Sequence, residues 1–319
     1  MRFAGHLRTV GELVRRQLLA PPAPPSREWN GPVRDPLAGD VRLSGRLSGR
    51  LPGECGGPLV LAVHGLGGSA DSRYLWELAA AAGRRDWAIL RLNLRGADRR
   101  GGDFHHGGLT ADLHAALASP ALAGYGPIAA VGFSLGGHTV LRLACEGADS
   151  RLRAVAAVCP PLDLAAGQQA IDRPGAWIYR RYVLRHLKQI YRAVAARPAV
   201  PLPLPVTAAE RIATLWDWDE AVVAPRYGFA GAADYYARAS VAPRLAALRV
   251  PALVVATQGD PMVPAATLRP WLELAPDAMT VRWVERGGHV AFPRRLSLGY
   301  GPERGLAGQL LAWCGAAIG

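Results

Sequence analysis

Apolar runs of strand length recur along the chain. Runs that are apolar at nearly every position, and that end in glycine-rich or polar turns, are typical of strands buried on both faces of a parallel sheet. Helical patterns separate several of these runs, so we expect a mostly parallel sheet with helices on both faces, which is an α/β fold. The runs lie at 59–63, 87–93, 127–133, 154–158, 252–256 and 280–284.

The chain before these runs carries weaker patterns. Apolar residues at helical spacing predict a short helix over 3–20, which the prolines of 21–25 end. Residues 41–51 alternate in part between apolar and polar side chains, which predicts an edge strand or a hairpin. We therefore interpret residues 1–38 as an N-terminal helix with a proline-rich connector, and residues 39–164 as the first part of an α/β core.

The strand pattern stops between 165 and 244. Apolar residues from Trp177 to Val194 recur there at helical spacing, and the basic residues of that stretch lie largely off the apolar stripe. We expect a helical cap over 165–244, followed by the second part of the core at 245–319. The basic helix fits a lid with a solvated arginine face, which the pattern favours, or a helix that contacts a membrane surface.

Length, charge and cysteine usage narrow the class of protein. A chain of 319 residues can bury a large core, and one α/β domain with an insertion fits this length. The net charge of +12 is almost entirely arginine, dispersed without a nucleic-acid-binding motif, so we expect no nucleic-acid partner. The 4 cysteines have neither paired nor metal-ligand spacing. The sequence carries no signal-peptide pattern and no apolar run of bilayer length, which predicts a cytoplasmic protein.

The apolar run before Ser134 leads into a motif that can carry chemistry. It ends in Gly132-Phe133-Ser134-Leu135-Gly136 and is followed by a helical pattern. A serine at the tip of so sharp a strand-to-helix turn has an exposed hydroxyl, and only glycine fits two residues before and after it, because strand and helix run close together. On its own, the pattern fits an ordinary strand-to-helix turn equally well.

A second glycine-rich turn follows the first long apolar run. This run ends in His64-Gly65-Leu66-Gly67-Gly68. A turn of this kind supplies half of an oxyanion hole in proteins that carry a serine elbow. We expect the backbone N–H groups of Leu66 and Leu135 to bind the developing oxyanion. A phosphate-binding loop is the alternative, but the turn lacks a Gly-Lys-Ser/Thr sequence and an acidic residue at the ribose position.

Two later turns hold the groups that would activate the serine. A serine hydroxyl needs an imidazole to take its proton, and a carboxylate to orient that imidazole and stabilise its charge. Asp260 and His289 each follow a predicted strand, and together with Ser134 they stand in the order expected for such a sheet. Each residue alone fits a surface turn, but the three in this order favour a catalytic triad. His105 and His106 stand side by side in a loop, where adjacent histidines seldom chelate one metal.

These motifs resemble the YheT-like branch of the α/β-hydrolases, which includes eukaryotic ABHD-type proteins. The likeness covers nearly the whole chain, and its stretch from Phe229 to Ser240 and its Gly287-Gly288-His289-Val290 turn are more specific than the serine elbow. The chain departs from the family at Gly259, where an aspartate is usual, and at Ala97, where a cysteine is usual. Further stretches that carry the likeness are Gly5-His6-Leu7-Arg8-Thr9, Asn93-Leu94-Arg95-Gly96, His106-Gly107-Gly108 and Pro160-Pro161-Leu162-Asp163-Leu164.

The resemblance implies a serine hydrolase that cleaves a carboxylic ester, either of a short or medium acyl chain or of a lipid. It implies that Ser134 is the nucleophile, His289 the base and Asp260 the acid of the triad, and that no metal or organic cofactor takes part. The expected partner is a small-molecule or lipid ester. An acyltransferase that uses the same acyl-enzyme, and a non-catalytic lipid- or membrane-binding protein with the same fold, remain as alternatives.

Overall fold

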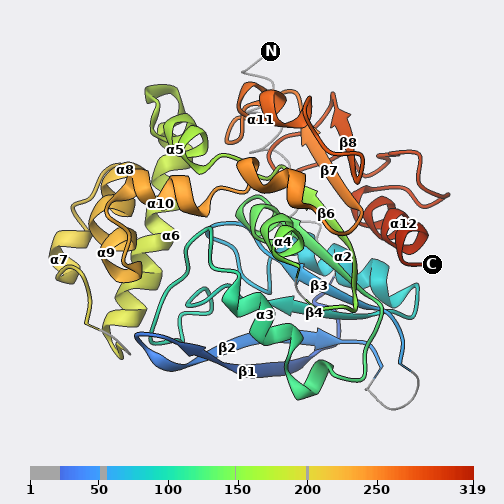
Figure 1. Ribbon diagram of the computed structural model, residues 1–319, viewed down its shortest axis with the longest axis horizontal. Helices are drawn as coiled ribbons and strands as arrows, with labels where there is room; N and C mark the ends of the chain where they lie inside the picture. Colours follow the sequence, from blue (N-terminus) through green and yellow to red (C-terminus); the bar gives the residue numbers. More distant parts are fainter. Residues whose placement is uncertain (1–21, 51–55, 148, 199–200) are drawn as a thin grey trace.

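An eight-stranded sheet runs through the middle of the molecule in the computed structural model (Figure 1). The structure describes residues 22–50, 56–147, 149–198 and 201–319. The strands lie in the order β1-β2-β4-β3-β5-β6-β7-β8. Their bounds are β1 (Arg27–Asp35), β2 (Gly39–Ser48), β3 (Leu59–Val63), β4 (Ala88–Leu92), β5 (Ile128–Phe133), β6 (Leu152–Val158), β7 (Ala252–Thr257) and β8 (Met279–Val284).

Six neighbouring strands, in the order β4-β3-β5-β6-β7-β8, pair in parallel. This confirms the mostly parallel sheet. At one edge, β1 and β2 form an antiparallel hairpin, and β2 pairs antiparallel with β4. The sequence analysis missed β1, because it assigned these residues to a connector. The inward face of β1 carries Trp29, Gly31, Val33 and Asp35, and the glycine and the charged residue obscure the apolar alternation of a strand.

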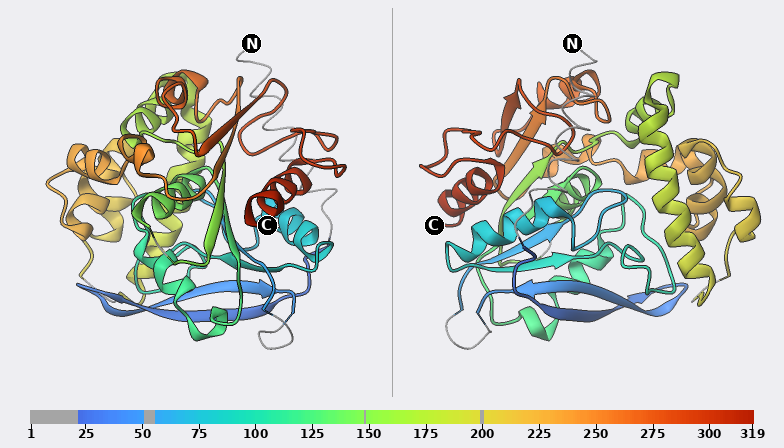
Figure 2. Two further views of the ribbon diagram at one scale, coloured as in Figure 1. Left: turned by 45° about the vertical axis from the view of Figure 1, so that its right-hand side comes forward. Right: turned by 180° about the vertical axis from the view of Figure 1, so that it is seen from behind.

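Helices cover both faces of the sheet (Figure 2). On one face, α2 (Arg73–Gly83) and α12 (Leu306–Ile318) share an apolar cluster with the strands. On the other face, α3 (Ala111–Leu117), α4 (Leu135–Glu146) and α11 (Ala265–Leu272) contribute to a second cluster. This layering confirms the expected α/β architecture.

Between β6 and β7, the described residues form helices and no strand, as the sequence predicts. These helices, which we call the cap, pack together at one side of the sheet, on the left in Figure 1. Their apolar side chains form a third cluster, which also includes Leu135 at the start of α4. The domain boundaries themselves stay predictions. The cap helices are α5 (Leu164–Asp172), η2 (Pro174–Ala176), α6 (Trp177–Ala195), α7 (Val206–Ala209), α8 (Leu215–Trp218), η3 (Asp219–Val223), α9 (Ala224–Tyr227) and α10 (Ala232–Ala239). The last helix before β7, η4 (Ala242–Ala247), belongs instead to the core cluster that contains α4.

Three helical regions differ from their sequence patterns or lie outside the described residues. The helix expected over 3–20 lies outside the described residues. Helix α3 begins at Ala111, and the turn before it is held by other contacts, such as the hydrogen bond from Gly107 N–H to the Tyr235 hydroxyl (2.9 Å). Trp177, expected in the apolar stripe of α6, is 55% exposed. Contact of this helix with a membrane surface stays a prediction.

In the part of the chain that the structure describes, no helix has both the length and the apolar character needed to cross a membrane. The cytoplasmic location stays a prediction.

A buried ion cluster joins the cap to the core. Arg226 of α9 donates hydrogen bonds to Asp103 (2.9 Å) and Asp35 (3.3 Å). Arg95, which follows β4, donates to Asp35 (2.6 Å), Asp103 (2.8 Å) and Asp112 (2.6 Å). All five side chains are buried. Burial alone would raise the pKa of Asp35, but hydrogen bonds from Arg95 and from backbone N–H groups hold that pKa below its usual range.

Replacing Arg226 by methionine should lower the free energy of unfolding by about 3–5 kcal/mol, because it removes one of two cations from this buried cluster. Urea denaturation at pH 7 measures the change. Arg238→Met is the matched control, since Arg238 forms an exposed pair with Asp234 on α10 and should change stability by less than ~1 kcal/mol. Equal losses in the two variants would contradict the role of the cluster.

The same measurement at lower pH tests the charge of Asp35. A carboxyl with a depressed folded-state pKa adds stability that is complete above its unfolded pKa of about 4 and is lost as the pH falls through the folded value. The stability difference between the wild type and Arg226→Met should therefore shrink as the pH is lowered below about 4.

Candidate active site

Ser134 lies between β5 and α4, on the sharp turn that the sequence predicts. Its backbone has φ 52° and ψ −121°, a conformation that is strained for a residue with a side chain. A Cβ at Gly132 would lie 2.1 Å from the carbonyl oxygen of Gly136, and a Cβ at Gly136 would lie 2.4 Å from that of His64. Both flanking positions therefore require glycine, as expected for a nucleophile elbow.

Ser134, His289 and Asp260 form a hydrogen-bonded row. His289 Nε2 lies 2.9 Å from Ser134 Oγ, and His289 Nδ1 lies 2.9 Å from Asp260 Oδ2. The other carboxylate oxygen of Asp260 accepts hydrogen bonds from the N–H groups of Met262 (2.8 Å) and Val263 (2.9 Å), which fix its orientation. The structure thus brings together the three residues selected from the sequence, and their catalytic role stays a prediction.

Cys159 is a neighbour of this row that the sequence analysis did not select. Its Sγ, a carboxylate oxygen of Asp260 and a ring nitrogen of His289 all lie within 4.8 Å of one another. Such a set could hold a metal ion, but His289 and Asp260 already bind each other. Burial, together with the charge of Asp260, raises the pKa of the Cys159 thiol well above its usual value. Because a protonated thiol is a poor metal ligand, we interpret Cys159 as a packing neighbour of the carboxylate.

Two backbone N–H groups beside Ser134 have no hydrogen-bond partner among the described residues. They belong to Leu66 and Leu135, the residues expected to form the oxyanion hole. Leu135 is the first residue of α4, where N–H groups point out of the helix. The loop that carries Leu66 packs against the serine, since a Cβ at Gly65 would lie 2.9 Å from that of Ser134. The arrangement can bind a negative charge that develops near Ser134 Oγ.

His64 fixes the loop that carries Leu66. Its Nδ1 donates to the carbonyl oxygen of Gly65 (2.8 Å), and its Nε2 accepts from the N–H of Leu94 (3.0 Å). Burial lowers the pKa of His64 to about 3, so the ring stays neutral, as this hydrogen-bond pattern requires. His64 is therefore a positioning residue for the candidate oxyanion hole.

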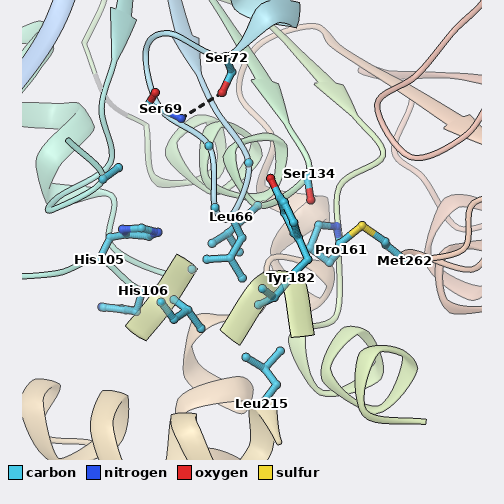
Figure 3. Close-up of a pocket in the computed structure, with 18 of the residues that line it drawn as sticks. Leu66, Ser69, Ser72, His105, His106, Ser134, Pro161, Tyr182, Leu215 and Met262 are labelled. Atoms are coloured by element: carbon cyan, nitrogen blue, oxygen red, sulfur yellow. Dashed lines mark hydrogen bonds between the residues drawn. The ribbon is translucent and has the colours of Figure 1, made fainter. Parts of the chain in front are cut away.

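A cavity of about 620 Å³ lies beside Ser134, between the core and the cap. Figure 3 shows Ser134 and Leu66 of the core, and Tyr182 and Leu215 of the cap, around this cavity. This volume is typical of sites for small molecules. The cap lines the cavity mainly with apolar and aromatic side chains, namely Ile171, Tyr179, Val183, Leu187, Leu215 and Trp218.

His105 and His106 lie in the loop before α3, as expected, and both line the cavity (Figure 3). His105 Nδ1 donates to the carbonyl oxygen of Arg95 (2.9 Å), and burial lowers the pKa of His105 to about 4. His106 Nδ1 accepts from the N–H of Gly108 (3.1 Å), and burial lowers the pKa of His106 well below its usual value. Both rings are therefore neutral parts of the cavity wall.

Comparisons with known proteins identify the family of the fold. Residues 58–295 match the family model described as the alpha/beta hydrolase fold. The YheT protein of Escherichia coli K12, which carries a provisional esterase name, is 32% identical over 241 residues, or 74% of this chain and 70% of YheT. The medium-chain fatty acid ethyl ester synthase/esterase 2 of Saccharomyces cerevisiae is 26% identical over 270 residues, or 74% of this chain and 58% of the yeast protein.

Solved structures share the fold. The esterase Pf2001 of Pyrococcus furiosus has a TM-score of 0.54 at 14% identity, covering 83% of this chain and 85% of its own. The esterase domain of a Rhodothermus marinus protein has a TM-score of 0.54 at 16% identity, covering 92% of this chain and 100% of its own. At these identities the likeness concerns the fold alone. Because the family model matches most of the chain and YheT matches most of both chains, this protein belongs to the α/β-hydrolase fold family.

Proposed function

We propose that this protein is a serine hydrolase that cleaves carboxylic esters of short or medium acyl chains, or of lipids. The observation that carries the proposal is the hydrogen-bonded row of Ser134, His289 and Asp260 beside a cavity with an apolar cap lining. An apolar cavity suits an acyl chain, and the row supplies an activated hydroxyl. The esterase names of the relatives support the same reaction class.

In the first half of the reaction, Ser134 Oγ attacks the ester carbonyl carbon while His289 Nε2 accepts the hydroxyl proton. Asp260 keeps the proton of His289 on Nδ1 and stabilises the imidazolium that forms. The N–H groups of Leu66 and Leu135 bind the oxyanion of the tetrahedral intermediate. His289 then gives the proton to the leaving alcohol, and the acyl group stays on Ser134.

In the second half, a water molecule takes the place of the alcohol. His289 accepts a proton from this water, which attacks the acyl-enzyme through a second tetrahedral intermediate. Collapse of that intermediate releases the carboxylic acid and returns the proton to Ser134. The cycle needs only this chain's own residues and water.

Labelling with a fluorophosphonate probe tests the proposal, because the probe reacts with activated serines. The wild type is expected to label, whereas Ser134→Ala and His289→Ala are not. A panel of p-nitrophenyl esters of graded chain length then measures which acyl group the cavity accepts. A folded wild type that neither labels nor hydrolyses any of these esters would contradict the proposal.

Acyl transfer is a second candidate because the yeast relative is named as both a synthase and an esterase of medium-chain fatty acid ethyl esters. An alcohol would then replace water as the acceptor of the acyl group. Adding ethanol to the ester assays and analysing the products separates the two reactions, since transfer gives an ethyl ester and hydrolysis gives the free acid.

A further inference from the structure

Asp219 is a buried carboxyl in the cavity wall that the proposed mechanism does not use. It begins the π-helix η3 in the cap, and it is 7% exposed. Its Oδ2 accepts a hydrogen bond from the Tyr236 hydroxyl (2.7 Å), whereas its Oδ1 accepts none from any described residue. A cavity-lining oxygen that no described side chain or backbone group satisfies is open to a ligand, and π-helical turns recur at functional sites. Asp219 is therefore a candidate for contact with a ligand.

His106 is a second polar residue that lines the cavity. Its ring lies 5.4 Å from that of Tyr235, which lies 5.1 Å from the ring of Tyr236, the partner of Asp219. Because His106 Nδ1 accepts from Gly108 N–H, the neutral ring carries its proton on Nε2. Among the described residues, this Nε2–H has no acceptor. The cavity wall therefore offers a ligand two polar groups, the Oδ1 side of the Asp219 carboxyl and the His106 Nε2–H.

Burial shifts the pKa values of Asp219, His105 and His106 toward their uncharged forms. It raises the pKa of Asp219 to about 7, against the opposing hydrogen bond from Tyr236 and with a further rise from nearby Asp172. It lowers the pKa of His106 well below its usual value and that of His105 to about 4. A charged ligand group would meet the same desolvation penalty. A hydroxyl avoids this penalty and suits both forms of the carboxyl, because it can donate to the ionised form and accept from the neutral form.

We propose that Asp219 binds a hydroxyl group on the acyl chain of the ester substrate. The hydroxyl donates to Oδ1 of the ionised carboxyl and accepts from Oδ1–H of the neutral form, because a hydroxyl can do both. Apolar side chains such as Leu215 and Trp218 line the same cavity as Asp219 and Ser134, which suits an aliphatic chain between the carbonyl and the hydroxyl. The substrate class is a hydroxyacyl ester, with the hydroxyl at a distance from the carbonyl. This proposal rests on the ester-hydrolase function proposed above.

The first test compares p-nitrophenyl esters of ω-hydroxy acids with the plain esters of the same chain length. For the wild type, the ratio of kcat/KM for the hydroxylated over the plain ester should peak at one chain length. Asp219→Leu should lower that ratio by about tenfold at the peak, the size expected for one buried hydrogen bond. Asp219→Asn should keep most of the preference, because an amide can also bind a hydroxyl. Asp234→Leu, at an exposed carboxyl on α10, is the matched control.

The outcomes separate this proposal from the proposed function. Hydrolysis of the plain esters tests the function alone. If the wild type hydrolyses them but no chain length favours the hydroxyl, the hydroxyl site is overturned while the function stands. The site is also overturned if Asp219→Leu lowers kcat/KM equally for both ester series, because that result points to a change of shape or stability.

A binding measurement covers the case in which no ester is turned over. Isothermal titration calorimetry measures the affinities of 1-hexanol and of its isomer methyl pentyl ether. Only 1-hexanol has a hydroxyl that can donate a hydrogen bond. Hexanol should bind about tenfold more tightly to the wild type and to Asp219→Asn, and this difference should vanish in Asp219→Leu. Equal affinities for the two isomers in the wild type would overturn the proposal independently of catalysis.

Discussion

Replacing Asp260 by asparagine is expected to lower kcat by about 10⁴-fold without unfolding the protein. Asparagine keeps an oxygen that can accept from the N–H groups of Met262 and Val263, which now lie 2.8 Å and 2.9 Å from the carboxylate. Its NH₂ group then replaces Oδ2, which lies 2.9 Å from His289 Nδ1. The ring must accept at Nδ1 and carry its proton on Nε2, so it cannot take the proton of Ser134.

Steady-state kinetics with the preferred p-nitrophenyl ester measure this change, and KM should stay close to the wild-type value because the cavity wall is unaltered. Asp163→Asn is the matched control. Asp163 caps α5 by accepting from the N–H of Ala166 (3.1 Å), so the substitution affects a structural carboxyl after a neighbouring strand and should leave kcat unchanged. An Asp260→Asn variant within about tenfold of wild-type kcat would mean that another group orients His289.

The parts of the site that depend on local sequence could be predicted. Gly132 is required by contacts within a single strand-turn-helix unit, and Gly136 by the close approach of the end of β3, and both recur at fixed positions of the elbow motif. Asp260 and His289 follow apolar runs, and the carboxyl ends of parallel strands meet at one edge of a sheet. The 2.9 Å contacts in the row could not be predicted, because they depend on how three separate loops pack.

Other features depend on contacts between distant segments. Asp35 faces inward on β1 because Arg95 and Arg226 neutralise its charge. Neither arginine lies near Asp35 in sequence. From the sequence alone, the residues of β1 therefore resemble a connector and not a strand. In the cap, Asp217 is exposed and Asp219 is buried, although both occur in the same Trp-Asp repeat. The packing of η3 against α10 decides which carboxyl reaches the cavity, and the sequence contains no local signal for that packing.

Replacing Ser134 by alanine is expected to lower kcat by about 10⁶-fold, because it removes the hydroxyl that forms the acyl-enzyme in the proposed mechanism. The residual rate should come from the oxyanion hole and from substrate binding alone. Ser119→Ala is the matched control. The Ser119 hydroxyl is buried, has no hydrogen-bond partner among the described residues and lies outside the cavity lining, so its removal should leave kcat unchanged.

Ser134→Gly should abolish activity to the same extent and yet make the protein more stable than Ser134→Ala by about 1 kcal/mol. The reason is the backbone at this position, with φ 52° and ψ −121°, which glycine adopts without strain and alanine does not. Urea denaturation measures the difference between the two variants. The same pair at Ser119, where φ is −65°, should show the opposite order, because glycine there only adds freedom to the unfolded chain. If glycine were the less stable choice at both positions, the elbow would hold no strain, and its backbone would be set by the local turn rather than imposed by the packing of β5 and α4.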